Sequence, residues 1–223
     1  MKVVLFGATG MVGQGALREC LLDPEVETVL AVVRKPGELE PHAKLRELVH
    51  EDFLDFSPVA DALTGYGACL WCLGITSAGM SEADYTRVTY GFTLAAAKVL
   101  AERNPAMTFI FVSGASTDAG GKAMWARVKG RAENAVAALP FKAAYMFRPG
   151  FIQPKHGIVS KTRSYRILYA VLTPAIPVLK LLMPKMLTTS EILGRAMLAV
   201  AKSGAGKTVL ESPDINALGQ STT

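Results

Sequence analysis

Short runs of apolar residues, separated by amphipathic segments, organise the first two thirds of the chain. The runs are four to six residues long and rich in β-branched or aromatic side chains, as in strands that are buried on both faces. They predict strands at residues 3–6, 28–33, 45–49, 68–73, 108–112 and 143–147. Helical spacing predicts helices at residues 11–22, 81–103 and 122–139. Strands alternating with helices predict an α/β fold with a doubly wound parallel sheet.

This alternation breaks down after residue 150. Residues 151–164 are expected to form a loop, and residues 165–187 are apolar but carry three cations and three prolines. The longest uncharged run, 167–179, is shorter than the roughly 20 apolar residues of a membrane-spanning helix. We therefore expect 151–187 to be a small, basic helical cap over the cleft of a single domain, 1–223. A capping-box pattern at 188–191 opens a further helix, and a last strand is expected at 208–210.

A glycine-rich segment, residues 7–13, joins the first strand to the first helix. Its first glycine allows a tight turn, the second lets the backbone approach a pyrophosphate, and the third lets the helix pack closely. The helix N-terminus then offers free N–H groups to phosphates. A tight turn without a ligand is the alternative. The predicted pyrophosphate-binding residues are Gly7, Thr9, Gly10, Met11, Val12 and Gly13.

The segment GATGMVG resembles the first turn of extended and atypical short-chain dehydrogenase/reductases. Further likenesses are Cys72-Leu73-Gly74-Ile75-Thr76, Phe111-Val112-Ser113, Lys129-Gly130-x-x-Glu133 and Arg148-Pro149-Gly150. The chain is most similar to the branch of Tat-interacting-protein-type oxidoreductases and NmrA-like, epimerase-like proteins, over nearly its whole length. The resemblance implies a Rossmann fold and a nicotinamide dinucleotide cofactor. It adds as cofactor-binding residues Leu73, Gly74, Ile75, Val112, Lys129, Pro149, Gly150 and Phe151.

The end of the second strand carries two cations, Arg34 and Lys35. A carboxylate at this position would hold the ribose hydroxyls of NAD, whereas cations suit the 2′-phosphate of NADP. Glu38 and Glu40 follow too late in the sequence to take the carboxylate role. We therefore predict that NADP(H) is preferred over NAD(H). A solvated pair of loop cations is the alternative interpretation.

Asp52 and Phe53 follow the third predicted strand. In the proteins that the chain resembles, this position packs beside the adenine ring. Both residues are therefore predicted to line the cofactor site. A cap at the start of a helix is an equally good interpretation of Asp52.

The resemblance also implies a catalytic Ser or Thr after strand five and a Tyr-x-x-x-Lys helix. In that arrangement Tyr transfers the proton, and Lys binds the nicotinamide ribose and lowers the Tyr pKa. Here the helix reads Trp125-Ala-Arg-Val-Lys129, and an indole N–H exchanges no proton near neutral pH. Lys129 and Ser113 are the predicted catalytic residues. Other hydroxyl groups that could carry the proton are those of Ser116, Tyr165 and Tyr169.

Two functions remain open on this sequence. The first is a weak or unusual NADP(H)-dependent oxidoreductase or epimerase acting on a small carbonyl or hydroxyl compound. The second is a non-catalytic, NADP(H)-binding redox-sensing or regulatory protein. Trp125 favours the second, whereas Lys129 and the apolar cap favour the first.

Charge is distributed unevenly along the chain. The net charge is +5, but residues 1–118 have a net charge of −6 and residues 119–223 one of +11. The segment 134–190 holds eight cations and no acid. This predicts contact with an anionic membrane surface or an acidic partner, with a plain substrate lid as the alternative. No aromatic or glycine-rich pattern accompanies the cations, so nucleic acid is not expected.

The cysteines and the N-terminal residues point to a reducing compartment. Three cysteines make no disulfide framework, and no secretory signal opens the chain, so a cytoplasmic location is expected. Cys69 and Cys72 have the spacing of a redox motif, but residues three apart on a strand face opposite sides. They are predicted to be buried structural thiols. The three histidines show no metal-ligand spacing, so no metal is expected.

Overall fold

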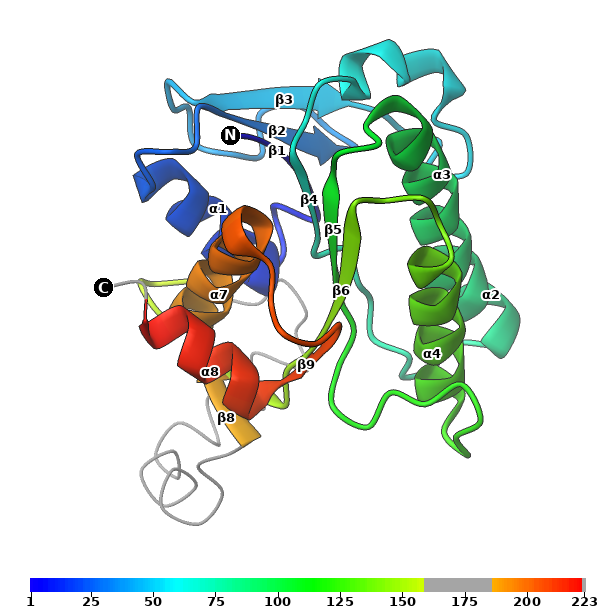
Figure 1. The fold of residues 1–223 in the computed structure, drawn as a ribbon. Coiled ribbons are helices and arrows are strands. Elements are labelled where there is room, and N and C mark those ends of the chain that lie inside the picture. The colour runs from blue at the N-terminus through cyan, green and yellow to red at the C-terminus, as the bar shows by residue number, and fades with distance from the viewer. Residues whose placement is uncertain (159–185, 222–223) are drawn as a thin grey trace.

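A seven-stranded parallel sheet forms the centre of the molecule (Figure 1). The computed structural model describes residues 1–158 and 186–221. The strand order is β3-β2-β1-β4-β5-β6-β9, with every neighbouring pair parallel, which is the Rossmann order extended by one strand. The strands are β1 (Lys2–Phe6), β2 (Thr28–Val33), β3 (Leu45–Val49), β4 (Ala68–Trp71), β5 (Thr108–Val112), β6 (Ala143–Arg148) and β9 (Val209–Glu211).

Helices cover both faces of this sheet (Figure 1). One face carries α1 (Met11–Leu22), α7 (Ser190–Ser203) and α8 (Ser212–Gln220), with α7 packed against the other two. The other face carries α2 (Glu82–Thr86), the π-helical turn η3 (Arg87–Phe92), α3 (Thr93–Arg103) and α4 (Met124–Ala137). Two short 3-10 turns, η1 (Ser57–Val59) and η2 (Asp61–Leu63), precede β4.

The alternation of side chains along β1 explains its continuous apolar sequence. Val3 and Leu5 pack in the core under α1 and α7, whereas Val4 and Phe6 pack in the core on the opposite face. All four are fully buried. The sheet is therefore covered on both sides, as the uninterrupted apolar runs predicted.

Two of the predicted elements need correction. The expected loop 151–164 contains a strand, β7 (Phe151–Gln153), which pairs in parallel with β8 (Leu187–Thr189). The long helix expected at 81–103 is interrupted by the π-helical turn. The chain also ends on α8, which the sequence pattern did not indicate. Most of the predicted helical cap, residues 159–185, lies outside the described residues.

Hydroxyl side chains cap the starts of two helices, but the capping box expected at 188–191 does not form, because the cap of α7 is Thr189 and its partner is Ile192. Ser81 precedes α2, and its hydroxyl oxygen accepts a hydrogen bond of 3.1 Å from the Asp84 N–H. Thr189 precedes α7 and accepts one of 3.1 Å from the Ile192 N–H. Each cap satisfies a donor that the first helical turn leaves open.

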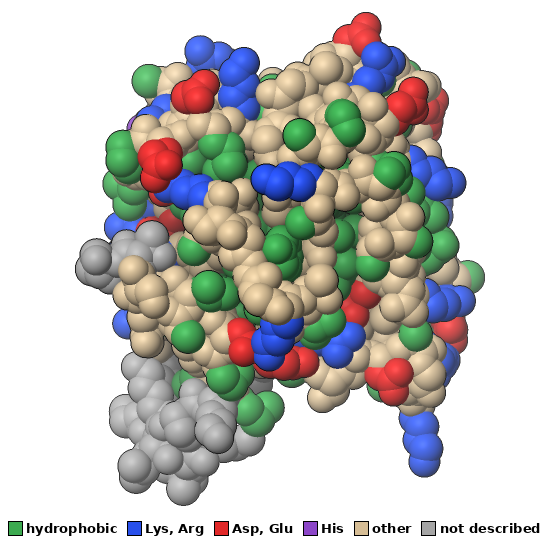
Figure 2. Space-filling view, in the orientation of Figure 1, with side chains coloured by type: hydrophobic (Ala, Val, Ile, Leu, Met, Phe, Trp, Pro, Cys, Tyr) green, Lys and Arg blue, Asp and Glu red, His purple; other side chains and the backbone are tan. Residues whose placement is uncertain are grey.

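Charged side chains of both signs are interspersed on the face drawn in Figure 2. On this face Lys and Arg do not gather in a single patch. Within the described part of the chain, no helix combines the length and apolar character that crossing a bilayer requires.

Candidate functional site

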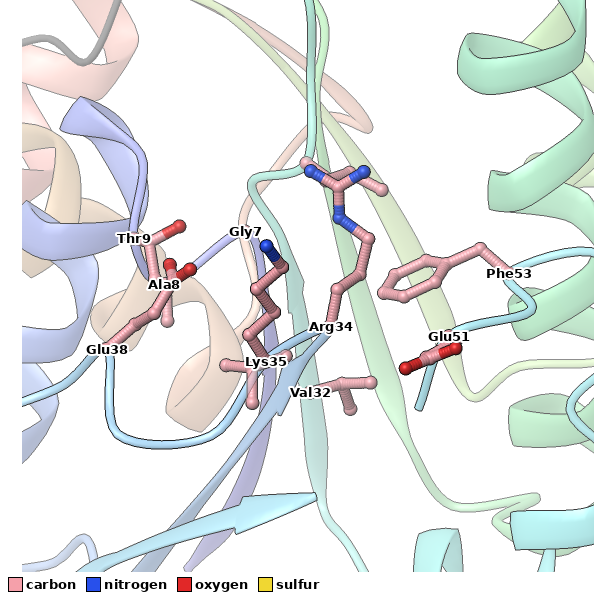
Figure 3. A pocket seen from close by; sticks show the side chains of 11 residues that line it. Gly7, Ala8, Thr9, Val32, Arg34, Lys35, Glu38, Glu51 and Phe53 are labelled. Atoms are coloured by element: carbon pink, nitrogen blue, oxygen red, sulfur yellow. The ribbon is translucent and has the colours of Figure 1, made fainter. Parts of the chain in front are cut away.

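A pocket of about 560 Å³ lies at the carboxyl ends of β1, β2, β3 and β4 (Figure 3). The order in which strands are added to the sheet reverses direction between β1 and β4. Open α/β sheets bind their ligands at such a switch point. Four separate loops contribute side chains to it. The lining residues are Gly7, Ala8, Thr9, Val32, Val33, Arg34, Lys35, Glu38, Glu51, Phe53 and Leu73.

Glycine is required twice in the loop between β1 and α1. Gly7 has a φ of +75°, and a Cβ there would lie 2.7 Å from the Leu73 nitrogen. At Gly13 a Cβ would lie 2.0 Å from the Gly7 carbonyl oxygen. The Gly10 N–H donates to that same oxygen at 2.9 Å, which closes the turn. The loop can therefore be this tight only with glycine at these places.

The N-terminus of α1 follows directly after the pocket-lining residues Gly7, Ala8 and Thr9. Gly10 is its N-cap, and no side chain caps the first turn, which also contains no acidic residue. The N–H groups of Met11, Val12 and Gly13 thus keep the positive end of the helix dipole available. This is the arrangement that the sequence predicted for a pyrophosphate.

Two exposed cations extend into the pocket from the end of β2. Figure 3 shows Lys35 pointing toward Gly7 and Arg34 passing beside the Phe53 ring. Phe53 is 4% exposed and packs edge-on against Phe6 with ring centroids 6.3 Å apart. The pocket therefore combines cationic side chains with a rigid apolar wall.

The carboxylates of the pocket are not the ones expected. Asp52 is exposed and absent from the lining, and its Oδ1 accepts a hydrogen bond of 2.9 Å from the Leu54 N–H. Its neighbour Glu51 lines the pocket instead. Glu38 also lines it, because the chain turns back after Lys35, and Figure 3 shows its carboxylate directed toward Ala8. Sequence distance alone had placed Glu38 too far away.

The other predicted cofactor residues lie at the ends of β4, β5 and β6. Leu73 lines the pocket, and Gly74 and Ile75 follow it on the exposed surface. Val112 packs partly against the core under α1. Beyond β6, the Pro149 carbonyl accepts from the Ala115 N–H at 2.9 Å, the Gly150 N–H donates to Ser212 Oγ at 2.8 Å, and Phe151 begins β7.

Ser113 is buried and turned toward an ion pair. It is 5% exposed, and its hydroxyl lies within hydrogen-bond distance of Glu133 Oε1. Glu133, 4% exposed, accepts hydrogen bonds at both oxygens from the Arg148 guanidinium. Glu133 raises the pKa of Arg148 further through this contact. The Ser113 hydroxyl is therefore part of a buried polar network, which does not favour it as a proton donor to a substrate.

Lys129 lies beside Ser113, as predicted. Its half-buried ammonium donates to the Ser113 carbonyl oxygen. Burial lowers the pKa of Lys129 to about 8, and the nearby Glu133 carboxylate opposes that shift. Trp125 lies one helical turn earlier on α4 and is half-buried. The arrangement supplies hydrogen-bond donors, but Trp125 offers no proton to transfer.

The cysteines occupy opposite faces of the sheet, as expected. Cys69 packs in the core under α3, whereas Cys72 packs against the core under α1. Burial raises the pKa of both thiols, and both are free. Within the described residues, no group of three or more His, Cys, Asp or Glu side chains could hold a metal ion.

Solved structures with the same architecture are numerous. An oxidoreductase of the short-chain dehydrogenase/reductase family from Burkholderia thailandensis superposes with a TM-score of 0.70 at 17% identity, over 97% of this chain and 92% of that one. A short-chain dehydrogenase/reductase from Saccharomyces cerevisiae gives 0.69 at 12% identity, over 97% and 98%. The chain therefore has the fold of the short-chain dehydrogenase/reductases. The Bordetella bronchiseptica enzyme WbmF, solved with NAD⁺, gives 0.67 at 13% identity, over 99% and 78%.

Curated relatives of the chain include fungal proteins named FMP52, mitochondrial. The protein from Meyerozyma guilliermondii is 25% identical over 154 residues, covering 68% of this chain and 65% of that one. The protein from Aspergillus fumigatus is 30% identical over 157 residues, covering 68% and 66%. The match thus spans just under two thirds of these relatives' own length. No protein-family model matches the chain.

Proposed function

We propose that the chain binds NADP(H) in the pocket at the carboxyl edge of the sheet. The observation that carries this proposal is that the glycine-rich loop leading into α1 and the cations Arg34 and Lys35 line one pocket. A pyrophosphate suits the helix N-terminus, and a 2′-phosphate suits the two cations. The NAD⁺ complexes of WbmF and of the UDP-glucuronic acid 4-epimerase from Bacillus cereus support a nicotinamide dinucleotide.

The proposed reaction is a slow hydride transfer to or from a small carbonyl or hydroxyl compound. When bound, the nicotinamide ring would supply the hydride chemistry. Lys129 would hold the nicotinamide ribose hydroxyls through N–H groups that remain after its contact with Ser113. Trp125 stands where a proton-transferring Tyr would be expected, so the proton has to come from water or another group.

A second function, that of a non-catalytic NADP(H)-binding regulator, is favoured by the residues at the ends of β5 and β6. Trp125 transfers no proton, and the Ser113 hydroxyl is committed to Glu133. Neither feature impairs the dinucleotide pocket, which lies at the other end of the site. Both functions require NADP(H) binding, and only the first requires turnover of a substrate.

Titration calorimetry with NADPH and NADH tests the shared proposal. A charge-assisted contact to the 2′-phosphate contributes about 1.5–3 kcal/mol, so NADPH should bind at least about tenfold more tightly. Equal affinity for both would contradict the NADP(H) preference, and binding of neither would contradict the site itself. Oxidation of bound NADPH in the presence of a carbonyl panel then separates enzyme from regulator.

We also propose that the segment 134–190 contacts an anionic membrane surface. Seven of its eight cations support this, all but the Arg148 that pairs with Glu133, since each adds about 1 kcal/mol near an anionic leaflet. Flotation with phosphatidylserine vesicles should recover the protein at low salt and release it at high salt. Absence from the floating fraction at low salt would contradict this proposal. Cytoplasmic location stays a prediction, and "mitochondrial" belongs to the names of the FMP52 relatives.

A further inference from the structure

The turn that follows β2 carries both pocket cations and is tied to the edge of the sheet. We call residues 34–40 the selector turn. The Gly37 N–H in this turn donates a hydrogen bond of 2.9 Å to Glu47 Oε2. Glu47 lies on β3, where it pairs in register with Ala31 of β2. The edge strand thus holds the turn through a charged acceptor, the stronger kind of hydrogen bond.

The second oxygen of Glu47 has no evident structural use. Oε1 is buried and has no hydrogen-bond partner among the described residues. Leaving a buried acceptor unsatisfied is costly, and more so for a carboxylate. Glu47 is absent from the pocket lining, so it does not serve the pocket by direct contact. Its contact with Gly37 is the role that the described structure supports.

That contact lies close to the two cations, because Gly37 follows Lys35 by two residues. Gly37 has a φ of +73°, and a Cβ there would meet nothing within 4 Å. The turn therefore depends on a left-handed backbone conformation rather than on close packing. Arg34 and Lys35 are exposed and flexible, so a fixed backbone beneath them reduces the entropy that a phosphate contact would otherwise cost.

We propose that Glu47 is a positioning residue that sets the preference for a 2′-phosphorylated dinucleotide. It acts by holding the selector turn so that Arg34 and Lys35 face the pocket. This proposal rests on the proposed function of the same site. The proposed pyrophosphate contacts would come from the loop before α1, a different segment from the selector turn.

The test compares three variants by calorimetric titration with NADPH and with NADH. Glu47→Leu removes the acceptor and should weaken NADPH binding about tenfold, the cost of immobilising two long side chains, while NADH binding changes less than twofold. Glu47→Gln keeps an acceptor for the Gly37 N–H and should restore the NADPH preference. Glu40→Leu, a matched loss of charge on the exposed part of the same turn, should not weaken NADPH binding.

Gly37→Ala is a second way to disturb the selector turn, since it strains the backbone at a positive φ without adding a clash. Gly37→Ala should lower the NADPH preference as Glu47→Leu does, and it can be measured even if Glu47→Leu folds poorly. An unchanged NADPH to NADH ratio in both variants would overturn the role of Glu47. Equal weakening of NADPH and NADH binding would also overturn it, because Glu47 would then maintain the whole pocket rather than the preference for one cofactor. Absence of any preference in the unaltered protein would instead refute the proposed function.

Discussion

The two ends of the site treat their polar side chains in opposite ways. At the β1–β3 end, Arg34 and Lys35 are exposed and extend into a pocket, and the first turn of α1 is uncapped. At the β5–β6 end, Ser113, Glu133 and Arg148 bind one another in the interior. The first end is prepared for a ligand, whereas the second uses its polar groups for its own structure. A protein built this way should bind a dinucleotide better than it transforms a substrate.

The largest effect is expected from breaking the buried ion pair between Glu133 and Arg148. Glu133→Ala leaves the partly buried Arg148 guanidinium with only its 3.8 Å ion pair to Glu211, which should lower the free energy of unfolding by up to about 3–5 kcal/mol. Glu82→Ala is a control, because Glu82 is 45% exposed and pairs with Arg127 at 2.8 Å, so its loss should cost under about 1 kcal/mol. Urea unfolding measures both. Equal losses would mean that Glu133 has no special structural role.

Restoring the proton donor addresses the same end of the site. Trp125→Tyr should raise single-turnover NADPH oxidation on a carbonyl panel, up to about a hundredfold, without tightening NADPH. The smaller ring leaves a cavity that can reduce this gain. Brisk turnover by the unaltered protein, lost in the variant, would show instead that the tryptophan belongs to a working site.

At the other end of the site, Arg34→Ala removes a predicted contact to the 2′-phosphate. NADPH affinity should fall by about 1.5–3 kcal/mol, while NADH affinity stays nearly unchanged. Calorimetric titration at two salt concentrations gives both values, and the NADPH difference should shrink at higher salt. A parallel loss for NADH would place Arg34 against a part shared by both cofactors.

The smallest expected effect is a pH dependence from Lys129. Its pKa is about 8 in the folded chain, whereas the ordinary value of an exposed lysine is 10.5, so the unfolded chain binds more protons between these values. Stability should therefore rise from pH 8 to 10.5, by on the order of 1 kcal/mol after allowance for partial exposure. Lys129→Met should abolish this rise relative to the unaltered protein. Matching urea-unfolding profiles for the two proteins would contradict the shift.

The sequence predicted most of the sheet because its strands are marked locally. β2, β3 and β5 have the bounds that the apolar runs indicated, and so does α1. β7 could not be found this way, because it has three residues and its partner β8 lies more than thirty residues further on. A parallel pair of this kind has no local turn signal.

The site was predicted where backbone chemistry dictates residue type and missed where tertiary contacts decide. Gly7 and Gly13 are required by the tightness of one turn, so spacing revealed them. The orientation of Ser113 depends on Glu133 and Arg148, which come from α4 and β6. Glu51 rather than Asp52 lines the pocket, a difference of one position that no pattern resolved.

The pairing of β7 with β8 also has a consequence for how such a protein can diversify. It fixes residues 151–153 beside residues 187–189, so both ends of the intervening stretch are held at neighbouring places on the scaffold. Loop-closure entropy rises only slowly with length, by about 0.6 kcal/mol per doubling. A longer or shorter connection between β7 and β8 should therefore change the free energy of folding little, which gives a site at which insertions are expected to be tolerated.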